Sequence, residues 1–290
     1  MKLCPECKNA FDTSGWVCPV CAFRPKFDGT TPLFAPSLAD ENDGFSGDYF
    51  DELAGLEAKN FWFRARNKLI LQALHKHCPD MRTFMEIGCG TGFVLSGVVA
   101  EFPRVEAAGM EIFSKGLIHA SRRVPGAEFI QADARHLPFE AHFNAIGAFD
   151  VLEHIEDDER VLTQIYQALV PGGTVILTVP QHSWLWSRQD ELAHHARRYN
   201  AADLQKKVET AGFTVSHSRS FVSLLLPLMW LSRHQISSAQ RADALIELRI
   251  GALTNFVLTS VMRIEALLTR IGIRFPAGGS LLLVARKPSP

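Results

Sequence analysis

Four of the six cysteines lie within the first 21 residues, as the pairs Cys4-Pro-Glu-Cys7 and Cys18-Pro-Val-Cys21. In a reducing compartment, two C-x-x-C pairs indicate a metal site and not a disulfide framework. Each pair forms a tight turn that directs two thiolates at one point, and two such turns complete a tetrahedron. Since four thiolates leave no open position, the metal would stabilise the fold and not catalyse. We predict structural zinc, with iron as the alternative.

The segment around these cysteines resembles a zinc ribbon, which we place at residues 1–26. Some two dozen residues cannot bury enough apolar surface to fold without such a metal. Residues 27–48 are rich in Pro, Gly, Asp and Ser, which is typical of a linker. The main domain would then occupy residues 49–290. The remaining Cys78 and Cys89 are predicted to be small, semi-buried thiols.

A second candidate site is the glycine-rich run Glu86-Ile87-Gly88-Cys89-Gly90-Thr91-Gly92. Glycine permits positive φ and lets a ligand approach the backbone without a Cβ in the way. A dinucleotide fingerprint would need glycine where Phe93 stands, and the Lys-Ser/Thr of a phosphate-binding P-loop is absent. The loop is therefore predicted to hold a ligand other than a pyrophosphate.

Short apolar strands and amphipathic helices alternate around this loop, a pattern typical of βαβ units and a parallel sheet covered on both faces. The glycine loop would lie at the carboxyl end of the first strand, where open α/β sheets bind ligands. Strands are predicted over 83–87, 105–110, 127–130, 143–149, 174–179, 213–217 and 280–286, and helices over 92–101, 114–122, 157–169 and 201–211.

In these motifs the chain resembles the class I S-adenosylmethionine-dependent methyltransferases, over roughly residues 60–219 and the last strand. The resemblance is carried by the glycine loop, by Glu111 after the second strand and by Asp133 after the third. It continues in Phe149-Asp150-Val151-Leu152-Glu153-His154 and Leu169-Val170-Pro171-Gly172-Gly173. It implies a Rossmann-like α/β fold with a seven-stranded sheet in the order 3-2-1-4-5-7-6, with strand seven antiparallel.

The resemblance also implies how S-adenosylmethionine would be held. Glu111 would accept hydrogen bonds from the ribose, Asp133 from the adenine amine, and Ala134 would offer its N–H to the ring. Glu86 would order the loop or meet the methionine amino group. The structural alternatives are a solvated strand-end acid at Glu111 and a turn acid at Asp133. The predicted cofactor-binding residues are Glu86, Gly88, Cys89, Gly90, Gly92, Glu111, Ile112, Asp133, Ala134, Asp150 and Val151.

Methyl transfer needs a base only when the acceptor carries a proton. His154 is the first candidate because an imidazole suits that task, and His195 is the rival. The alternative for His154 is a helix-start histidine bonded to backbone. The loop after the fifth strand and the aromatic run near Phe61 are predicted to recognise the acceptor through Trp62, Arg64, Trp186, Asp190, Arg198 and Tyr199. Equally, the aromatics could be core residues and the loop a salt-bridged element anchored by Tyr199.

Residues 220–276 interrupt the expected end of the sheet. An amphipathic stretch over roughly 239–271 would place Leu245, Leu248, Ala252, Phe256, Val257 and Ile264 on one apolar face. We predict a helical insertion that packs on the sheet. A lid or membrane-surface element that admits a greasy substrate is the alternative, and would allow peripheral membrane contact.

The composition supports a folded core, with 47% hydrophobic residues, and the net charge of −1 offers no general attraction for nucleic acid. No signal core or membrane span is predicted, so we expect a cytoplasmic protein. We predict methyl transfer from S-adenosylmethionine to an O or N atom of a small, partly apolar molecule. One alternative is an RNA methyltransferase that grips RNA with the ribbon. The other is a non-catalytic scaffold that binds the cofactor and docks a partner.

Overall fold

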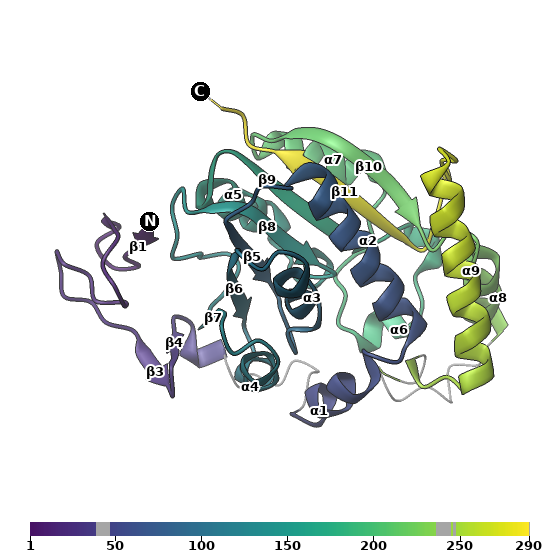
Figure 1. Ribbon diagram of the computed structural model, residues 1–290, viewed down its shortest axis with the longest axis horizontal. Coiled ribbons are helices and arrows are strands. Elements are labelled where there is room, and N and C mark those ends of the chain that lie inside the picture. Colours follow the sequence, from purple (N-terminus) through teal and green to yellow (C-terminus); the bar gives the residue numbers. More distant parts are fainter. Residues whose placement is uncertain (39–46, 236–244, 246–247, 290) are drawn as a thin grey trace.

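The computed structural model describes residues 1–38, 47–235, 245 and 248–289 (Figure 1). The strands are β1 (Lys2–Leu3), β2 (Ala10–Phe11), β3 (Lys26–Asp28), β4 (Thr31–Leu33), β5 (Thr83–Ile87), β6 (Glu106–Glu111), β7 (Glu128–Gln131), β8 (Phe143–Phe149), β9 (Leu169–Pro180), β10 (Thr214–Phe221) and β11 (Ser280–Arg286). The α-helices are α1 (Gly47–Leu56), α2 (Phe61–His77), α3 (Phe93–Glu101), α4 (Ser114–Arg123), α5 (Asp158–Ala168), α6 (Arg188–Leu192), α7 (Ala201–Thr210), α8 (Leu226–Gln235) and α9 (Ala252–Arg270). Short 3-10 turns are η1 (Pro36–Leu38), η2 (Leu152–His154) and η3 (Ser183–Leu185).

The central sheet is mostly parallel and Rossmann-like, and it holds nine strands in the order β10-β11-β9-β8-β5-β6-β7-β4-β3. The seven strands expected from the sequence run β7-β6-β5-β8-β9-β11-β10 within it, and β11 is antiparallel to both of its neighbours. The two further strands, β4 and β3, extend the sheet beyond β7. The expected count of seven was therefore too low by this hairpin.

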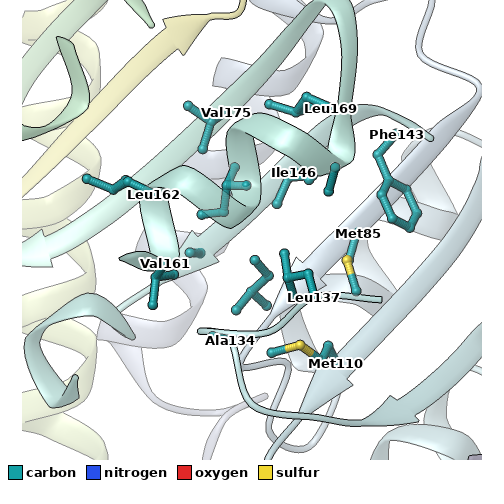
Figure 2. Close-up of a cluster of buried hydrophobic side chains, with 14 of the residues drawn as sticks. Met85, Met110, Ala134, Leu137, Phe143, Ile146, Val161, Leu162, Leu169 and Val175 are labelled. Atoms are coloured by element: carbon teal, nitrogen blue, oxygen red, sulfur yellow. The ribbon is translucent and has the colours of Figure 1, made fainter. Parts of the chain in front are cut away.

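Both faces of the sheet are buried, because each central strand is apolar on both sides. Phe84 packs with residues of α2, α3 and α4, whereas the adjacent Met85 packs with α5 and α7. Figure 2 shows the second of these clusters, to which Val161 and Leu162 of α5 and Ile146 of β8 all belong. A rigid, doubly covered sheet fixes the carboxyl ends of β5 to β8, from which the candidate site is built.

The cysteine-containing segment is docked on the main domain. The Nε1–H of Trp16 donates to Oε1 of Glu128 at 3.0 Å, and the Trp16 ring lies 5.4 Å from that of Phe139. The amide of Leu3 donates to the carbonyl of Pro138 at 2.9 Å. Figure 1 places this segment beside the β3–β4 hairpin, at the end of the sheet opposite α8 and α9. The buried tryptophan explains the docking, because it covers apolar surface on both parts.

Residues 27–48 do not form a loose linker throughout. β4 pairs in parallel with β7 through Leu33 and Gln131. The Gln131 side chain also accepts from the amide of Ala35 at 3.0 Å and donates to its carbonyl at 2.8 Å. The edge of β7 offered unpaired backbone groups, and this segment satisfies them. Residues 39–46 of the expected linker lie outside the described residues.

The insertion forms helices, as predicted, but its apolar face is oriented differently from the prediction. Phe256, Val257 and Ile264 of α9 are 50–67% exposed, while Met262 and Glu265 are buried. α9 is long and apolar enough to cross a membrane, by length and composition alone, and 11% of that apolar stretch is buried. The expectation that the chain has no membrane span therefore stays a prediction. Residues 236–244, 246 and 247, part of the predicted amphipathic stretch, lie outside the described residues.

Candidate active site

A cavity of about 1460 Å³ opens at the carboxyl ends of β5, β6, β7 and β8. Strand-end and loop residues form one side of it, and α1, α2, α8 and α9 contribute to the other. Fourteen of the predicted site residues line it, namely Trp62, Glu86, Gly88, Cys89, Gly90, Glu111, Ile112, Asp133, Ala134, Asp150, Val151, His154, His195 and Arg198. Five predicted residues do not line it: Arg64, Gly92, Trp186, Asp190 and Tyr199.

Three glycines of the loop, Gly88, Gly90 and Gly92, have positive φ angles, and their surroundings differ. At Gly88 a Cβ would lie 2.4 Å from Cγ2 of Val151, and at Gly92 it would lie 3.0 Å from Cα of Ala120. At Gly90 a Cβ would meet nothing within 4 Å. Gly88 and Gly92 are thus required for close packing, whereas Gly90 faces open space. Gly92 does not line the cavity, because it caps the start of α3 and packs against α4.

Glu111 is held rigidly at the end of β6. Its Oε2 accepts from the amide of Gly90 at 2.9 Å, and its Oε1 accepts from the amides of Ile112 at 2.8 Å and Phe113 at 3.2 Å. Burial raises the pKa of Glu111 above its usual value, and the backbone donors oppose that shift. A carboxylate has about four acceptor positions, so about one position remains for a ligand's hydroxyl group.

Asp133 lies one strand further along the same edge, after β7. Arg135 binds its carboxylate. The Nε of Arg135 lies 3.0 Å from Oδ1 and 2.9 Å from Oδ2, and its Nη2 lies 2.8 Å from Oδ2. Burial would raise the pKa of Asp133, but the hydrogen bonds and charge of Arg135 outweigh burial, so this pKa lies below its usual value. The acid therefore stays ionised, and shares its acceptor capacity between Arg135 and the cavity.

Glu86, at the end of β5, is buried at 3% exposure beneath the glycine loop. Among the described residues, its Oε2 has no hydrogen-bond partner. Burial raises the pKa of Glu86 to about 8, and the positive charge of Arg66 opposes the shift. A buried carboxyl oxygen without a partner is costly. The site is thus suited to a ligand that brings a hydrogen-bond donor or a positive charge to this point.

Arg66 of α2 is a cavity residue that the sequence argument missed. Its guanidinium forms an ion pair with Asp150 and lies 4.4 Å from the Trp62 ring centroid. The predicted arginine, Arg64, is exposed instead. Helix geometry explains the error, because Arg66 is four residues after Trp62 and shares its face, whereas Arg64 is two residues after it. That spacing was the available signal.

A second missed group secures the end of the glycine loop. The Thr91 hydroxyl donates to Oε1 of Glu57 at 2.7 Å, and Arg123 donates to Oε2 of Glu57 at 2.8 Å and to the Thr91 carbonyl at 2.9 Å. Glu57 precedes α2 and Arg123 ends α4. No local sequence signal marks this group, because its members meet only when both segments pack on the loop.

The two candidate bases lie side by side in the cavity, beyond the carboxyl end of β8. The rings of His154 and His195 are T-shaped with centroids 4.7 Å apart. Burial, aided by the charge of His195, lowers the pKa of His154 to about 3, so His154 is neutral near pH 7. Glu153 is 1% exposed, and burial followed by the charge of Asp150 raises its pKa well above the usual value.

Asp190 supports the acceptor loop from behind the cavity. Its Oδ1 lies 2.9 Å from Nδ1 of His195 and accepts from Nε of Arg198 at 2.7 Å. Burial would raise the pKa of Asp190, yet the hydrogen bond of His195 and the charge of Arg198 lower it well below the usual range. Asp190 was predicted to contact the acceptor directly, but the structure places it where it orients His195 and Arg198.

Tyr199 and Trp186 do not reach the cavity. The Tyr199 hydroxyl donates to Oδ2 of Asp158 at 2.6 Å, and its backbone pairs with Gln181 at the end of β9. Trp186 is 39% exposed outside the lining. Of the two interpretations weighed for this loop, the salt-bridged anchor applies to Tyr199 and Asp190, while His195 and Arg198 face the cavity.

The four cysteines of the first 21 residues converge. Their sulfur atoms all lie within 4.8 Å of one another, with Cys4 3.5 Å from Cys21 and Cys7 3.6 Å from Cys18. Four thiolates bound at about 2.3 Å around one tetrahedral metal would lie roughly 3.8 Å apart. The spacing and the donor set both fit such an ion.

Comparison with known proteins places the chain in a family. A family model described as a methyltransferase domain matches residues 57–218. A Mycolicibacterium smegmatis protein named "Probable S-adenosylmethionine-dependent methyltransferase" is 29% identical over 166 residues, which are 56% of this chain and 63% of that protein. A trans-aconitate 2-methyltransferase of Azoarcus is 27% identical over 119 residues, 41% of this chain and 45% of that protein. The chain thus spans less than two thirds of these curated relatives.

Solved structures show the same fold at low identity. Haemonchus contortus phosphoethanolamine N-methyltransferase 2, in complex with S-adenosyl-L-methionine, aligns with a TM-score of 0.58 at 17% identity, over 86% of this chain and 59% of that one. The cyclase SpnF aligns with a TM-score of 0.54 at 20% identity, over 86% of each chain. The matched residues 57–218 are more than half of the chain and contain the glycine loop and the strand-end acids. The chain therefore belongs to the methyltransferase domain family.

Proposed function

We propose that this protein transfers the methyl group of S-adenosylmethionine to an O or N atom of a small, partly apolar molecule. The observation that carries the proposal is the row of acids at adjacent strand ends. Glu86, Glu111 and Asp133 all line one cavity, beside a glycine that leaves open space at Gly90. The family match and the relatives named as S-adenosylmethionine-dependent methyltransferases support the same activity.

The acids fit the polar groups of the cofactor one by one. The remaining acceptor position of Glu111 suits a ribose hydroxyl, and Asp133 suits the adenine amine beside the N–H of Ala134. The orphaned oxygen of Glu86 suits the methionine ammonium. A site lined with carboxylates is also electrostatically favourable for a positively charged sulfonium. When bound, S-adenosylmethionine supplies a methyl group that is already activated for in-line displacement.

The rest of the cavity suits an acceptor with apolar parts. Leu225, Leu228, Met229, Leu248 and Leu258 line it from α8, α9 and the segments beside them. A cavity of about 1460 Å³ exceeds the roughly 300–1,000 Å³ of an ordinary ligand site, so it has room for two molecules. The chain's contribution to catalysis is to align them and exclude water, which is worth several kcal/mol.

His195 is the residue best placed to take a proton from the acceptor. Asp190 holds its Nδ1, so that Nε2 is the nitrogen available for that step. His154 packs against the same ring. Asp190 therefore acts as a positioning residue, comparable to the acid that orients an imidazole in other general-base sites.

Calorimetric titration with S-adenosylmethionine and S-adenosylhomocysteine tests the cofactor, and turnover of methyl-labelled cofactor on a metabolite extract tests the reaction. We expect binding of both ligands and label in small molecules. Binding without turnover would favour the scaffold alternative, and label in RNA with a salt-sensitive gel shift would favour the RNA alternative. No binding of either ligand would contradict the proposal.

We further propose that the four cysteines hold a structural zinc ion. Cys4→Ser would remove one of four ligands, and metal binding in so small a segment is coupled to its folding. We expect zinc to be lost and the Trp16 fluorescence to change, while affinity for S-adenosylhomocysteine falls less than about threefold, well below the effect of one lost buried hydrogen bond. Elemental analysis and calorimetry measure the two outcomes. A full zinc content in the variant would contradict the proposed ligand set, and iron in the wild type would replace zinc.

A further inference from the structure

A second group of metal-ligating side chains lies inside the cavity. Glu153, His154 and His195 each offer one atom that could bind a metal, and these three atoms lie within 4.8 Å of one another. Glu153 and His154 belong to η2 after β8, and His195 follows α6. The amide of Ala196 donates to the carbonyl of Glu153 at 2.6 Å, which fixes the loop that carries His195 to the turn that carries the other two.

Glu153 supplies an observation that is independent of the cluster's geometry. Its side chain is 1% exposed, and its Oε2 has no hydrogen-bond partner among the residues described. Buried carboxylate oxygens are normally paired with a donor, an ion or an ordered water, because leaving one unsatisfied is costly. The Glu153 side chain that carries this oxygen lies beside the imidazoles of His154 and His195, and imidazole is a common metal ligand in proteins.

His195 is held as a metal-binding histidine usually is. Its Nδ1 lies 2.9 Å from Oδ1 of Asp190, which is itself 1% exposed. Asp190 is fixed in turn by the amide of Ser187 at 2.9 Å and by Arg198. Metal-ligating histidines almost always donate their other ring N–H to a carboxylate or a carbonyl, which fixes the tautomer and directs the second nitrogen at the ion. Asp190 therefore leaves Nε2 of His195 available as a ligand, and with the ion bound this nitrogen no longer serves as the base.

We infer that Glu153, His154 and His195 bind one divalent transition-metal ion, with open coordination positions that face the acceptor. Two imidazoles and one carboxylate suit manganese, iron, cobalt or zinc better than magnesium, which prefers oxygen ligands alone. The site is separate from the four-cysteine site, whose thiolates would fill every position of their own ion.

The acceptor chemistry that follows rests on the proposed methyl transfer, although metal binding does not. A hydroxyl oxygen that coordinates the ion has a lowered pKa and loses its proton to solvent water. The oxygen's electron pair then forms the bond to the methyl carbon, and the carbon–sulfur bond breaks with its electrons going to sulfur. The inference therefore narrows the acceptor to a molecule with a hydroxyl group that can bind the metal, and the reaction to O-methylation.

Cobalt(II) titration of the full chain, with zinc already bound at the four cysteines, tests the site. We expect one additional cobalt per chain, with the weak ligand-field bands of nitrogen and oxygen ligands and without sulfur charge-transfer bands. Asp190→Asn, which keeps all three ligands, should weaken this binding about 10- to 100-fold. Glu153→Gln and His195→Ala, which each remove a ligand, should weaken it more. His75→Ala, at a half-exposed histidine of α2, is the matched control and should leave binding unchanged.

Two outcomes would overturn the inference: no cobalt beyond the cysteine site, or equal affinity in wild type, Glu153→Gln and His195→Ala. Circular dichroism identifies a variant that has failed to fold, and Asp190→Asn then provides the alternative comparison. Titration with S-adenosylhomocysteine separates this result from the proposed function. Cofactor binding without cobalt binding refutes only the metal site, and cobalt binding without cofactor binding refutes only the methyltransferase assignment.

Discussion

The two halves of the cavity are built differently. The half assigned to the cofactor consists of short turns after adjacent strands, where the position of each acid is fixed by backbone hydrogen bonds such as that from Gly90 to Glu111. The half assigned to the acceptor consists of segments far apart in sequence. Asp190 and Arg233 are brought together there, and so are Asn60 and Leu248.

This difference indicates that the cofactor half is rigid and that the acceptor half can vary between related proteins. Parallel strands keep their ends in fixed register, so the cofactor half inherits the geometry of the sheet. The acceptor half depends on helices such as α8 and α9, which pack on one side only. Such walls can change without disturbing the sheet, and they suit a pocket whose selectivity differs among proteins of one fold.

Glu111→Ala should have the largest effect on the cofactor half. It removes the proposed acceptor of the ribose and the partner of three backbone amides, so affinity for S-adenosylhomocysteine should fall by about 1–3 kcal/mol or more. Calorimetry measures this loss. Glu106→Ala, at the exposed first residue of the same strand, is the control and should bind as wild type does. Unchanged affinity in Glu111→Ala would remove the assignment of this half.

Arg66→Gln compared with Arg64→Gln tests the boundary between the halves. Arg66 is paired with Asp150 and packs on Trp62, so its loss leaves a partly buried charge without its partner. We expect the free energy of unfolding, measured with urea, to fall by about 1–3 kcal/mol. Arg64 is exposed, and Arg64→Gln should stay within about 0.5 kcal/mol of wild type. Equal effects would mean that the helix face has been assigned incorrectly.

The pH dependence of stability sharpens the description of the cofactor half. Burial raises the pKa of Glu86 to about 8 from 4.5, so the ligand-free folded state retains a proton that the unfolded state has lost. Stability from this group is therefore full below pH 4.5 and is lost as pH rises towards 8. Glu86→Gln should flatten that slope, whereas Glu101→Gln, at a half-exposed acid, should not. Identical slopes in wild type and Glu86→Gln would show that Glu86 ionises normally.

The smallest effect is expected on the outer face of the acceptor half. Phe256 is 67% exposed, so Phe256→Ser should change the free energy of unfolding by less than about 0.5 kcal/mol. Met262→Ala, in the same helix but buried, should cost about 2 kcal/mol or more. The alternative of a membrane-surface element predicts that Phe256→Ser also weakens flotation with lipid vesicles. A large loss of stability in Phe256→Ser would show that another part of the protein covers this face.

Much of the cofactor half could be predicted because its signals are local. The spacing of Gly88 and Gly90, and the acids directly after predicted strands, place those residues by strand-end geometry alone. Gly92 does not line the cavity, since it packs against Ala120. Tyr199 and Arg64 do not line it either, and the sequence could not show this, because a residue's type says nothing about which side of a loop or helix faces the cavity.

The amino-acid sequence by itself determined the alternation of strands and helices, the cysteine pairs and the acids at the strand ends. These depend on periodicity and on residues close together in the chain. Only the tertiary structure determined that Arg66 meets Asp150, that Glu57 and Arg123 enclose Thr91, and that Glu153, His154 and His195 converge. It also placed β3 and β4 on the sheet edge. Such contacts join segments tens to hundreds of residues apart, and which of them form depends on how whole faces pack.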